Sequence, residues 1–268
     1  MELDGKRVLL SGATGGLGRA IAEQLAANGA KLVLSSRKKD DLQELARSLP
    51  GGARRHTVVV ADLAKEGAPE KLVRDAGDVD VLVANAALPG TGRLESFSGE
   101  EVRRALRVNL EAPILIAREL GPNLTEKGEG HMVFIASLAG KVASPRASIY
   151  AATKFGLRGF AFGLREDLLP HGVGVSVVSP HFVREAGMFH ETGAKPAPGL
   201  GTTTPRKVAK AVVRAIQRNR SEITVAPRRA RFLTEIGHRH PGLAGRVQRR
   251  GGAARIAEQI HLGHGDKR

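Results

Sequence analysis

Short apolar runs alternate with amphipathic stretches along most of the 268-residue chain. The run at 7–11 leads into glycines, and residues 19–28 place apolar side chains at helical spacing and stop at Gly29, which can end a helix. A second helix is predicted over 39–48. We predict strands at residues 7–11, 31–36, 57–61, 79–84, 132–136, 172–179 and 222–226. Strands this apolar, alternating with helices, indicate an α/β fold with a parallel sheet covered on both faces.

A helix start and a helix interruption are visible between the fourth and fifth predicted strands. Ser98 and Glu101 have the spacing of a capping box. Within that helix Asn109 is a poor helix former, and Pro113 has no N–H to donate to the carbonyl of residue 109. We therefore predict a kink that frees the Asn109 carbonyl. The alternative is a kinked helix whose asparagine only points at water.

Residues 181–204 form the longest stretch without a clear period, and they are rich in glycine and proline. A connection of this length in a compact domain is typical of a lid, a binding loop or a disordered segment. We expect a substrate lid, whose apolar side chains favour an apolar ligand. These side chains are Phe182, Met188, Phe189 and Leu200. Thr204 and Pro205 then predict the start of a helix.

The length suits one large α/β domain or two small ones. The chain has no cysteine, which excludes disulfides, thiolate metal sites and cysteine nucleophiles. We assign no metal-binding residues. The start at Met1 shows no secretory signal pattern, and no apolar run reaches the roughly 18 residues of a spanning helix. We therefore expect a cytoplasmic protein.

The net charge is +15, and a basic C-terminal extension, residues 227–268, carries ten lysines and arginines against three acidic residues. Such an extension can bind nucleic acid or an anionic membrane surface. Its single aromatic residue, Phe232, offers little for base stacking. A solvated extension is the more typical interpretation, and a third is that it packs on the subunit or shapes the pocket. We separate it from a main domain of residues 1–226.

The first predicted strand runs directly into a glycine-rich loop between Ser11 and Gly18. Glycines allow a tight turn and a close approach of the backbone to a pyrophosphate, and the next helix offers free N–H groups to the anion. A glycine turn without a ligand is the alternative. The position between a first strand and a first helix favours a dinucleotide site.

The second predicted strand ends at Ser36 and is followed by Arg37, Lys38 and Lys39. In a dinucleotide fold this position faces the adenosine ribose, where a carboxylate would bind the 2′-hydroxyl. Arg37 instead offers a guanidinium that matches phosphate oxygens. We therefore predict NADP(H) in preference to NAD(H). A solvated basic turn is the alternative.

Tyr150 is the only tyrosine, and Lys154 lies four residues after it, on the same face of a helix. A phenol beside a fixed cation exchanges a proton more easily than a free one, which suits alcohol and carbonyl chemistry. The pair alone is weak evidence for a catalytic site, because a lysine at this spacing also arises by chance. Its weight comes from Ser137, at the end of the fifth predicted strand, and from the glycine loop.

With these residues assembled, the chain resembles the classical short-chain dehydrogenase/reductase family over roughly residues 4–226. The family's glycine motif matches Ser11, Gly12, Gly16 and Gly18, and its Asn-Asn-Ala-Gly motif corresponds to Ala84-Asn85-Ala86-Ala87. Its four catalytic residues fall on Asn109, Ser137, Tyr150 and Lys154. The resemblance implies a single Rossmann-like, doubly wound, three-layer domain with a seven-stranded parallel sheet. It also implies a homodimer or homotetramer.

Two sets of binding residues follow from the loop and the resemblance together. The predicted cofactor-binding residues are Gly12, Thr14, Gly15, Gly16, Leu17, Gly18, Ser36, Arg37, Asp62, Leu63, Asn85, Ala86, Tyr150, Lys154, Pro180 and Val183. Among these, Asp62 resembles the family's adenine-binding acid. The predicted substrate-binding residues are Ser137, Tyr150, His181 and Met188.

The chain departs from the family pattern near the nicotinamide half of the cofactor. Ala84 and Ala87 replace an asparagine and a glycine, but Asn85 is retained, so we expect local repacking with binding preserved. His181 replaces the glycine of a Pro-Gly motif. It could reach the nicotinamide or the substrate, or it could merely cap the strand. The threonine that binds the carboxamide has no clear match in residues 183–186.

The resemblance implies hydride transfer between nicotinamide and a carbonyl or secondary alcohol, with Tyr150 as general acid and base. Its pKa would have to fall from ~10 toward ~7, and Lys154 and the oxidised nicotinamide could supply that shift. Lys154 would also bind the nicotinamide ribose, Ser137 the substrate oxygen, and the Asn109 carbonyl a relay water. We expect an NADP(H)-dependent carbonyl reductase or its reverse. The alternative is an NADP-binding regulatory or scaffold protein that uses its basic extension on an anionic partner.

Overall fold

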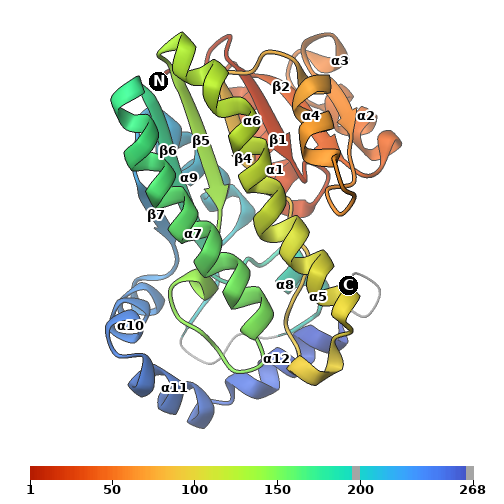
Figure 1. The fold of residues 1–268 in the computed structure, drawn as a ribbon. Helices are drawn as coiled ribbons and strands as arrows, with labels where there is room; N and C mark the ends of the chain where they lie inside the picture. The colour runs from red at the N-terminus through yellow and green to blue at the C-terminus, as the bar shows by residue number, and fades with distance from the viewer. Residues whose placement is uncertain (195–199, 264–268) are drawn as a thin grey trace.

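Parallel pairing joins seven strands into one sheet in the order β3-β2-β1-β4-β5-β6-β7 (Figure 1). The computed structural model describes residues 1–194 and 200–263. The strands are β1 (Arg7–Ser11), β2 (Lys31–Ser36), β3 (Thr57–Val60), β4 (Val81–Ala84), β5 (Gly130–Ile135), β6 (Val173–Pro180) and β7 (Glu222–Val225). All seven lie where the apolar runs predicted them, with ends shifted by at most two residues.

Helices connect the strands and continue past the last one. The α-helices are α1 (Gly16–Ala27), α2 (Lys39–Ser48), α3 (Gly52–Arg55), α4 (Ala68–Ala76), α5 (Gly99–Leu106), α6 (Ala112–Lys127), α7 (Ser148–Leu168), α8 (Met188–Glu191), α9 (Pro205–Gln217), α10 (Arg228–Arg239), α11 (Pro241–Arg250) and α12 (Ala253–Leu262). The short turns are η1 (Leu94–Ser96), η2 (Arg107–Glu111), η3 (Leu138–Gly140) and η4 (Leu169–His171).

Two apolar cores lie on opposite faces of the sheet. One joins α1, α2 and α9 to side chains such as Leu10 and Val178, and the other joins α4, α6 and α7 to side chains such as Leu9 and Phe134. Adjacent strand residues such as Leu9 and Leu10 therefore face different cores, as alternation along a strand requires. This arrangement confirms the predicted single-domain, three-layer, doubly wound fold, in which crossover helices cover both faces.

Two predicted helix starts are present as expected. The Ser98 hydroxyl accepts from the Glu101 N–H, and the Glu101 carboxylate accepts from the Ser98 N–H, which completes the capping box of α5. The Thr204 hydroxyl accepts from the Lys207 N–H, and Pro205 is the first residue of α9.

The interruption expected near Asn109 takes the form of a π-helical turn, η2, between α5 and α6. Pro113 follows it in the first turn of α6 and cannot donate a backbone hydrogen bond to the carbonyl of residue 109. The Asn109 side chain is only 1% exposed. The alternative in which it points at water is therefore wrong.

The basic extension folds, in its described part, into α10, α11 and α12. These helices lie below the arrowheads of the sheet, beside the carboxyl ends of the strands (Figure 1). Of our three interpretations of the extension, the structure supports the one in which it packs on the subunit and shapes the pocket. No helix in the described part of the chain is both long enough and apolar enough to span a membrane.

Close packing between the glycine loop and α1 leads to a stability prediction. A Cβ at Gly18 would overlap with the Gly12 carbonyl oxygen, whereas a Cβ at Gly15 would lie 3.6 Å from that same atom, an ordinary contact. We expect Gly18→Ala to lower the free energy of unfolding by about 2 kcal/mol or more, because backbone must move. Gly15→Ala, in the same loop, should change it by less than about 1 kcal/mol. Urea denaturation of both variants measures this, and equal effects would contradict the packing argument.

Candidate active site

A cavity of about 1060 Å³ opens at the carboxyl ends of the strands. Every predicted binding residue lines it, from Gly12 in the loop after β1 to Met188 at the start of α8. Of the four predicted catalytic residues, Ser137, Tyr150 and Lys154 also line it, and Asn109 does not. The sheet topology explains this gathering, because all strands are parallel and their carboxyl ends meet at one edge.

Three predicted catalytic side chains come together from two elements. Tyr150 and Lys154 lie one turn apart on α7, and Ser137 follows β5 at the start of η3. The Ser137 hydroxyl accepts from the Ala139 N–H at 3.1 Å and is hydrogen-bonded to the Tyr150 phenol. The Lys154 ammonium lies 5.7 Å from the centre of the Tyr150 ring and donates to the Ile135 carbonyl at 2.9 Å. The serine turn and the tyrosine helix thus hold one another in place.

Burial sets the proton affinities of this pair in the protein alone. Burial raises the pKa of Tyr150 to about 12, although the hydrogen bond to Ser137 opposes the rise. Burial also lowers the pKa of Lys154 to about 8. The surrounding protein groups therefore do not bring the tyrosine pKa down toward 7, as we expected Lys154 to do.

Asn109 lies behind the cavity and holds two segments together. Its side-chain oxygen accepts from the Leu88 N–H at 2.6 Å, and its amide donates to the Leu88 carbonyl at 2.9 Å. The amide also contacts the Thr153 hydroxyl at 3.5 Å, and that hydroxyl donates to the Tyr150 carbonyl at 2.8 Å. The side chain of Asn109 thus fixes the segment after β4 against the helix that carries the tyrosine.

The glycine loop is fixed to the end of the neighbouring strand β4. Gly12 has a φ of +65°, and a Cβ there would lie 2.8 Å from the Cα of Ala86. The Ser11 hydroxyl accepts from the N–H groups of Asn85 and Ala86 at 3.1 and 3.2 Å. The Asn85 amide donates to the carbonyls of Ser11 and Gly12 at 3.2 and 3.0 Å. Asn85 therefore anchors the glycine loop even though alanines stand at positions 84 and 87.

The groups at the end of β2 match those that a phosphorylated ribose needs. The Ser36 hydroxyl is buried and has no hydrogen-bond partner among the described residues. Arg37 is exposed and lines the cavity, and within the described chain its guanidinium makes no ion pair or hydrogen bond. Asp62 follows the neighbouring strand β3 and also lines the cavity, and its carboxylate accepts from the Ala64 N–H at 3.2 Å. A hydroxyl, a guanidinium and a glycine cradle together fit a nicotinamide dinucleotide.

His181 lines the cavity as well as continuing strand β6. Its backbone N–H donates to the Val225 carbonyl at 3.0 Å, and its ring packs on Phe182 at 4.7 Å between centres. Its Nε2 is buried without a partner in the described part of the chain. Burial lowers the pKa of His181 to about 4, so the ring is neutral at pH 7.

The two ends of the lid predicted at 181–204 are joined to each other. Val183 and Thr203 form an isolated parallel bridge, and the Phe182 ring stacks on Phe189 of the short helix α8 at 4.3 Å. Ala186 reaches the glycine loop, where a Cβ at Gly16 would collide with it. The prolines and glycine at 196, 198 and 199 lie outside the described residues.

A cluster of charged side chains around the buried Lys141 joins the serine turn to β7 and to the C-terminal helices. The Lys141 ammonium, 6% exposed, contacts the carboxylates of Glu222 and Glu235 at 3.0 and 3.6 Å. Arg158 of α7 donates two hydrogen bonds to Glu222 at 3.0 and 3.1 Å. Although burial opposes the effect, these partners hold the pKa of Glu222 below its usual value. We call Lys141, Arg158, Glu222 and Glu235 the ion cluster.

The C-terminal extension forms a further wall of the cavity, a role that the sequence offered only as one of three interpretations. α10, α11 and α12 contribute lining residues such as Leu233, Ile236, Val247 and Ile256. A signal was present in α10, where buried Ala230, Thr234 and Gly237 recur at helical spacing. The arginines around them hid this short apolar stripe.

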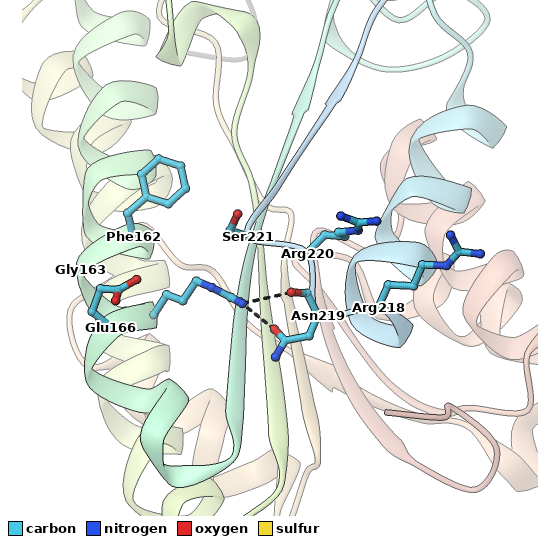
Figure 2. A pocket seen from close by; sticks show the side chains of 8 residues that line it. Phe162, Gly163, Glu166, Arg218, Asn219, Arg220 and Ser221 are labelled. Carbon is cyan, nitrogen blue, oxygen red and sulfur yellow. Dashed lines mark hydrogen bonds between the residues drawn. The ribbon is translucent and has the colours of Figure 1, made fainter.

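A second hollow lies at the other end of the sheet, beside Ser221 just before β7 (Figure 2). It measures about 760 Å³. Arg165 is one of its lining residues and donates to Asn219, which Figure 2 labels, at 2.7 Å to the side-chain oxygen and 3.1 Å to the carbonyl. This arginine is satisfied by the protein, and none of the predicted site residues lines the hollow. The cavity at the carboxyl ends is therefore the candidate active site.

Known proteins resemble this chain in both sequence and structure. A family model described as short chain dehydrogenase matches residues 6–197. The ketoacyl reductase HetN of Nostoc sp. is 35% identical over 227 residues, covering 83% of this chain and 79% of that protein. A metagenomic short-chain oxidoreductase in complex with NADP aligns with a TM-score of 0.70 and 29% identity, over 85% of this chain and 99% of the other. The 3-ketoacyl-(acyl-carrier-protein) reductase from Brucella melitensis, complexed with NADH, aligns with a TM-score of 0.75 and 26% identity, over 85% and 99%.

The chain belongs to the classical short-chain dehydrogenase/reductase family. It is an oxidoreductase of that family, as the ketoacyl reductase among its relatives and the shared fold both indicate.

The single tyrosine makes the pKa of Tyr150 directly measurable. The chain has one tyrosine and no tryptophan, so the tyrosinate absorbance of the folded protein reports one group. With a pKa of about 12 in place of 10.0, about one molecule in a hundred should be ionised at pH 10, against about half for a free tyrosine. A spectrophotometric titration, with circular dichroism to verify that the fold persists, measures this. Half-ionisation at or below pH 10 in the protein alone would contradict the burial effect.

Proposed function

We propose that this protein is an NADP(H)-dependent oxidoreductase that transfers a hydride between nicotinamide and an apolar carbonyl or secondary alcohol. The observation that carries the proposal is the convergence of Ser137, Tyr150 and Lys154 on the same cavity as the glycine loop. The relatives support it, since a related structure holds NADP and a related protein is a ketoacyl reductase.

The nicotinamide, when bound, would supply or accept the hydride at the carbonyl carbon. The chain's own residues would bind the substrate oxygen and exchange its proton. Ser137 would hydrogen-bond the substrate oxygen and fix its approach, and Tyr150, already hydrogen-bonded to Ser137, would give that oxygen its proton in reduction. In oxidation the same phenol would receive the proton. Since burial raises the pKa of Tyr150 to about 12, the protein alone keeps it in the donor form.

Lys154 has a separate role in the proposal. Its ammonium lies beside the Tyr150 ring and, among the described residues, donates one hydrogen bond, to the Ile135 carbonyl at 2.9 Å, which leaves two donors for the nicotinamide ribose and the phenol. A cation moved onto the phenol oxygen would favour the tyrosinate. The Asn109 carbonyl, beside Pro113, would hold a water that links Lys154 to solvent.

Arg37 and Ser36 support NADP(H) as the cofactor. A guanidinium without a partner in the described chain, next to a buried unpaired hydroxyl, suits a 2′-phosphate, and no carboxylate ends β2. The Brucella melitensis enzyme was solved with NADH, so the fold accepts either dinucleotide, and the choice lies in these side chains. We further propose a homodimer or homotetramer in the cytoplasm.

A regulatory or scaffold role for the basic extension loses its main support. That alternative requires the extension to be available to an anionic partner, whereas α10, α11 and α12 line the cavity that holds Tyr150. We therefore assign the extension to the enzyme.

Tyr150→Phe tests the proton transfer. The substitution keeps the ring and removes the hydroxyl, so carbonyl reduction by NADPH should fall by about 10²-fold or more, since proton transfer by a positioned acid contributes 10²–10⁴-fold. NADPH binding, measured by the cofactor's fluorescence, should change little. Near-normal turnover with intact NADPH binding would show that another group donates the proton.

Arg37→Ala tests the cofactor choice. Loss of a charge-assisted pair to the 2′-phosphate should weaken NADPH binding by about 10-fold or more and leave NADH binding within about twofold. Lys38→Ala is the matched control, because Lys38 neighbours Arg37 and also lines the cavity. An equal loss for both cofactors in Arg37→Ala would remove the phosphate role.

A further inference from the structure

The C-terminal helices bridge the cavity mouth and are anchored on both sides of it. On one side, the His238 ring nitrogen Nδ1 donates to the Lys141 carbonyl at 3.2 Å, and the Gln248 amide donates to the Ala143 carbonyl at 3.0 Å. Arg146 forms an ion pair with Glu258 of α12 on the same side. Lys141 to Arg146 is the segment that follows the serine turn, so these helices are positioned directly by the catalytic region.

On the other side, α12 reaches the segment before α5 and the lid. His261 donates from Nδ1 to the Thr91 carbonyl at 3.1 Å, and its ring meets the edge of the Phe97 ring at 6.0 Å. Gly263, just past α12, packs so closely on Thr192 that a Cβ would lie 2.7 Å from its Cα. α10, α11 and α12 therefore form a fixed cap over the mouth, which Figure 1 shows below the strand ends. We call them the cap.

The inner surface of the cap is mainly aliphatic. Its large apolar lining side chains are Leu233, Ile236, Leu243, Val247, Ile256 and Ile260. Three polar residues also line it. The Thr234 hydroxyl donates to the Ala230 carbonyl at 2.8 Å and the Gln248 amide to Ala143, while Arg229 is exposed and the Gln248 Oε1 has no partner among the described residues. Leu233, Leu243 and Val247 are also 42%, 51% and 58% exposed, so this wall continues to the outer surface. An extended apolar chain suits such a surface, whereas a small polar substrate would leave it wet.

We infer that the cap is the specificity wall of the enzyme, and that the substrate is a carbonyl compound or alcohol bearing a long unbranched apolar chain. The inference rests on the proposed function. The carbonyl lies at Ser137 and Tyr150, and the chain runs along the aliphatic face of the cap toward Leu243 and Val247. The cap thereby selects for the length of the substrate's chain, whereas Ser137 and Tyr150 contact only the carbonyl and do not select for length.

A homologous ketone series measures the selection. With 2-butanone, 2-octanone and 2-dodecanone and NADPH, we expect kcat/KM to rise by about fourfold for each buried methylene over the shorter members. The gain should level off where the chain reaches the surface. A flat series across these three ketones would overturn the inference.

A pair of neighbouring alanines in α12 provides a matched test. Ala253 lines the cavity and Ala254 does not. We expect Ala253→Phe to reduce the ratio of kcat/KM for 2-dodecanone to that for 2-butanone by about tenfold or more, because the ring occupies the chain's path. Ala254→Phe should preserve the wild-type ratio. Equal ratios in wild type and Ala253→Phe, with both proteins folded, would overturn the inference.

Binding without turnover separates this inference from the proposed function. The chain has no tryptophan, so Ile260→Trp places a single fluorophore in the cavity wall, and Phe232→Trp places one at a 65% exposed position that does not line the cavity. Titration with 2-dodecanol should change the Ile260→Trp emission saturably and leave Phe232→Trp unchanged. Absence of a saturable change at Ile260→Trp would overturn the inference even if ketones are reduced. Saturable binding without any Tyr150-dependent reduction would support the chain site and reject the proposed function.

Discussion

The hydrogen bonds between the ends of β1 and β4 are the constraint on which the site depends. From β1 the chain adds β2 and β3 on one side of the sheet, and from β4 it adds β5, β6 and β7 on the other side. The connections therefore diverge at this pair, and a crevice opens between them. Ser11 and Asn85 exchange hydrogen bonds across it and fix the glycine loop so closely that only glycine fits at position 12. The cofactor cradle, the segment that Asn109 holds and the start of α7 are all positioned relative to this junction.

The catalytic pair shows how burial and chemistry oppose one another. Removing water from Tyr150 and Lys154 favours the neutral form of each, which raises one pKa and lowers the other. The folded chain therefore holds a proton donor and a weakened cation. A charge-developing reaction in the same low-dielectric site would feel the lysine strongly, because the same burial that costs the cation also strengthens its field.

Much of the fold follows from sequence pattern because the strands are buried on both faces. Runs such as Val81 to Ala84 are apolar at every position, as a strand buried on both faces requires. The two helix starts were predictable because Ser98 and Thr204 cap their helices by local contacts. The π turn was foreseen only as an interruption, since Pro113 removes a hydrogen bond without specifying how the chain adapts.

The sequence could not select the pocket-shaping role of the extension from its three interpretations, and it could not give the tyrosine pKa; both limits have physical reasons. The apolar side chains of α10 to α12 face a cavity and not a packed core, so their pattern is sparse and interrupted by arginines. The pKa of Tyr150 depends on how deeply α7 is covered, and no spacing of residues records that. That Ser137, Tyr150 and Lys154 come together, by contrast, could be predicted, because Tyr150 and Lys154 share one helix and Ser137 follows a neighbouring strand.

The ion cluster limits how this enzyme could be remodelled. Lys141 follows the serine turn, Arg158 lies on the helix of the tyrosine, Glu222 opens β7, and Glu235 belongs to α10. If an exchanged set of C-terminal helices carried no carboxylate at the position of Glu235, the buried Lys141 would lose one of its two acidic partners. The cap is therefore not an independent module. Evolution or engineering that grafts a new one must also carry a matching carboxylate, or alter the turn that orients the serine.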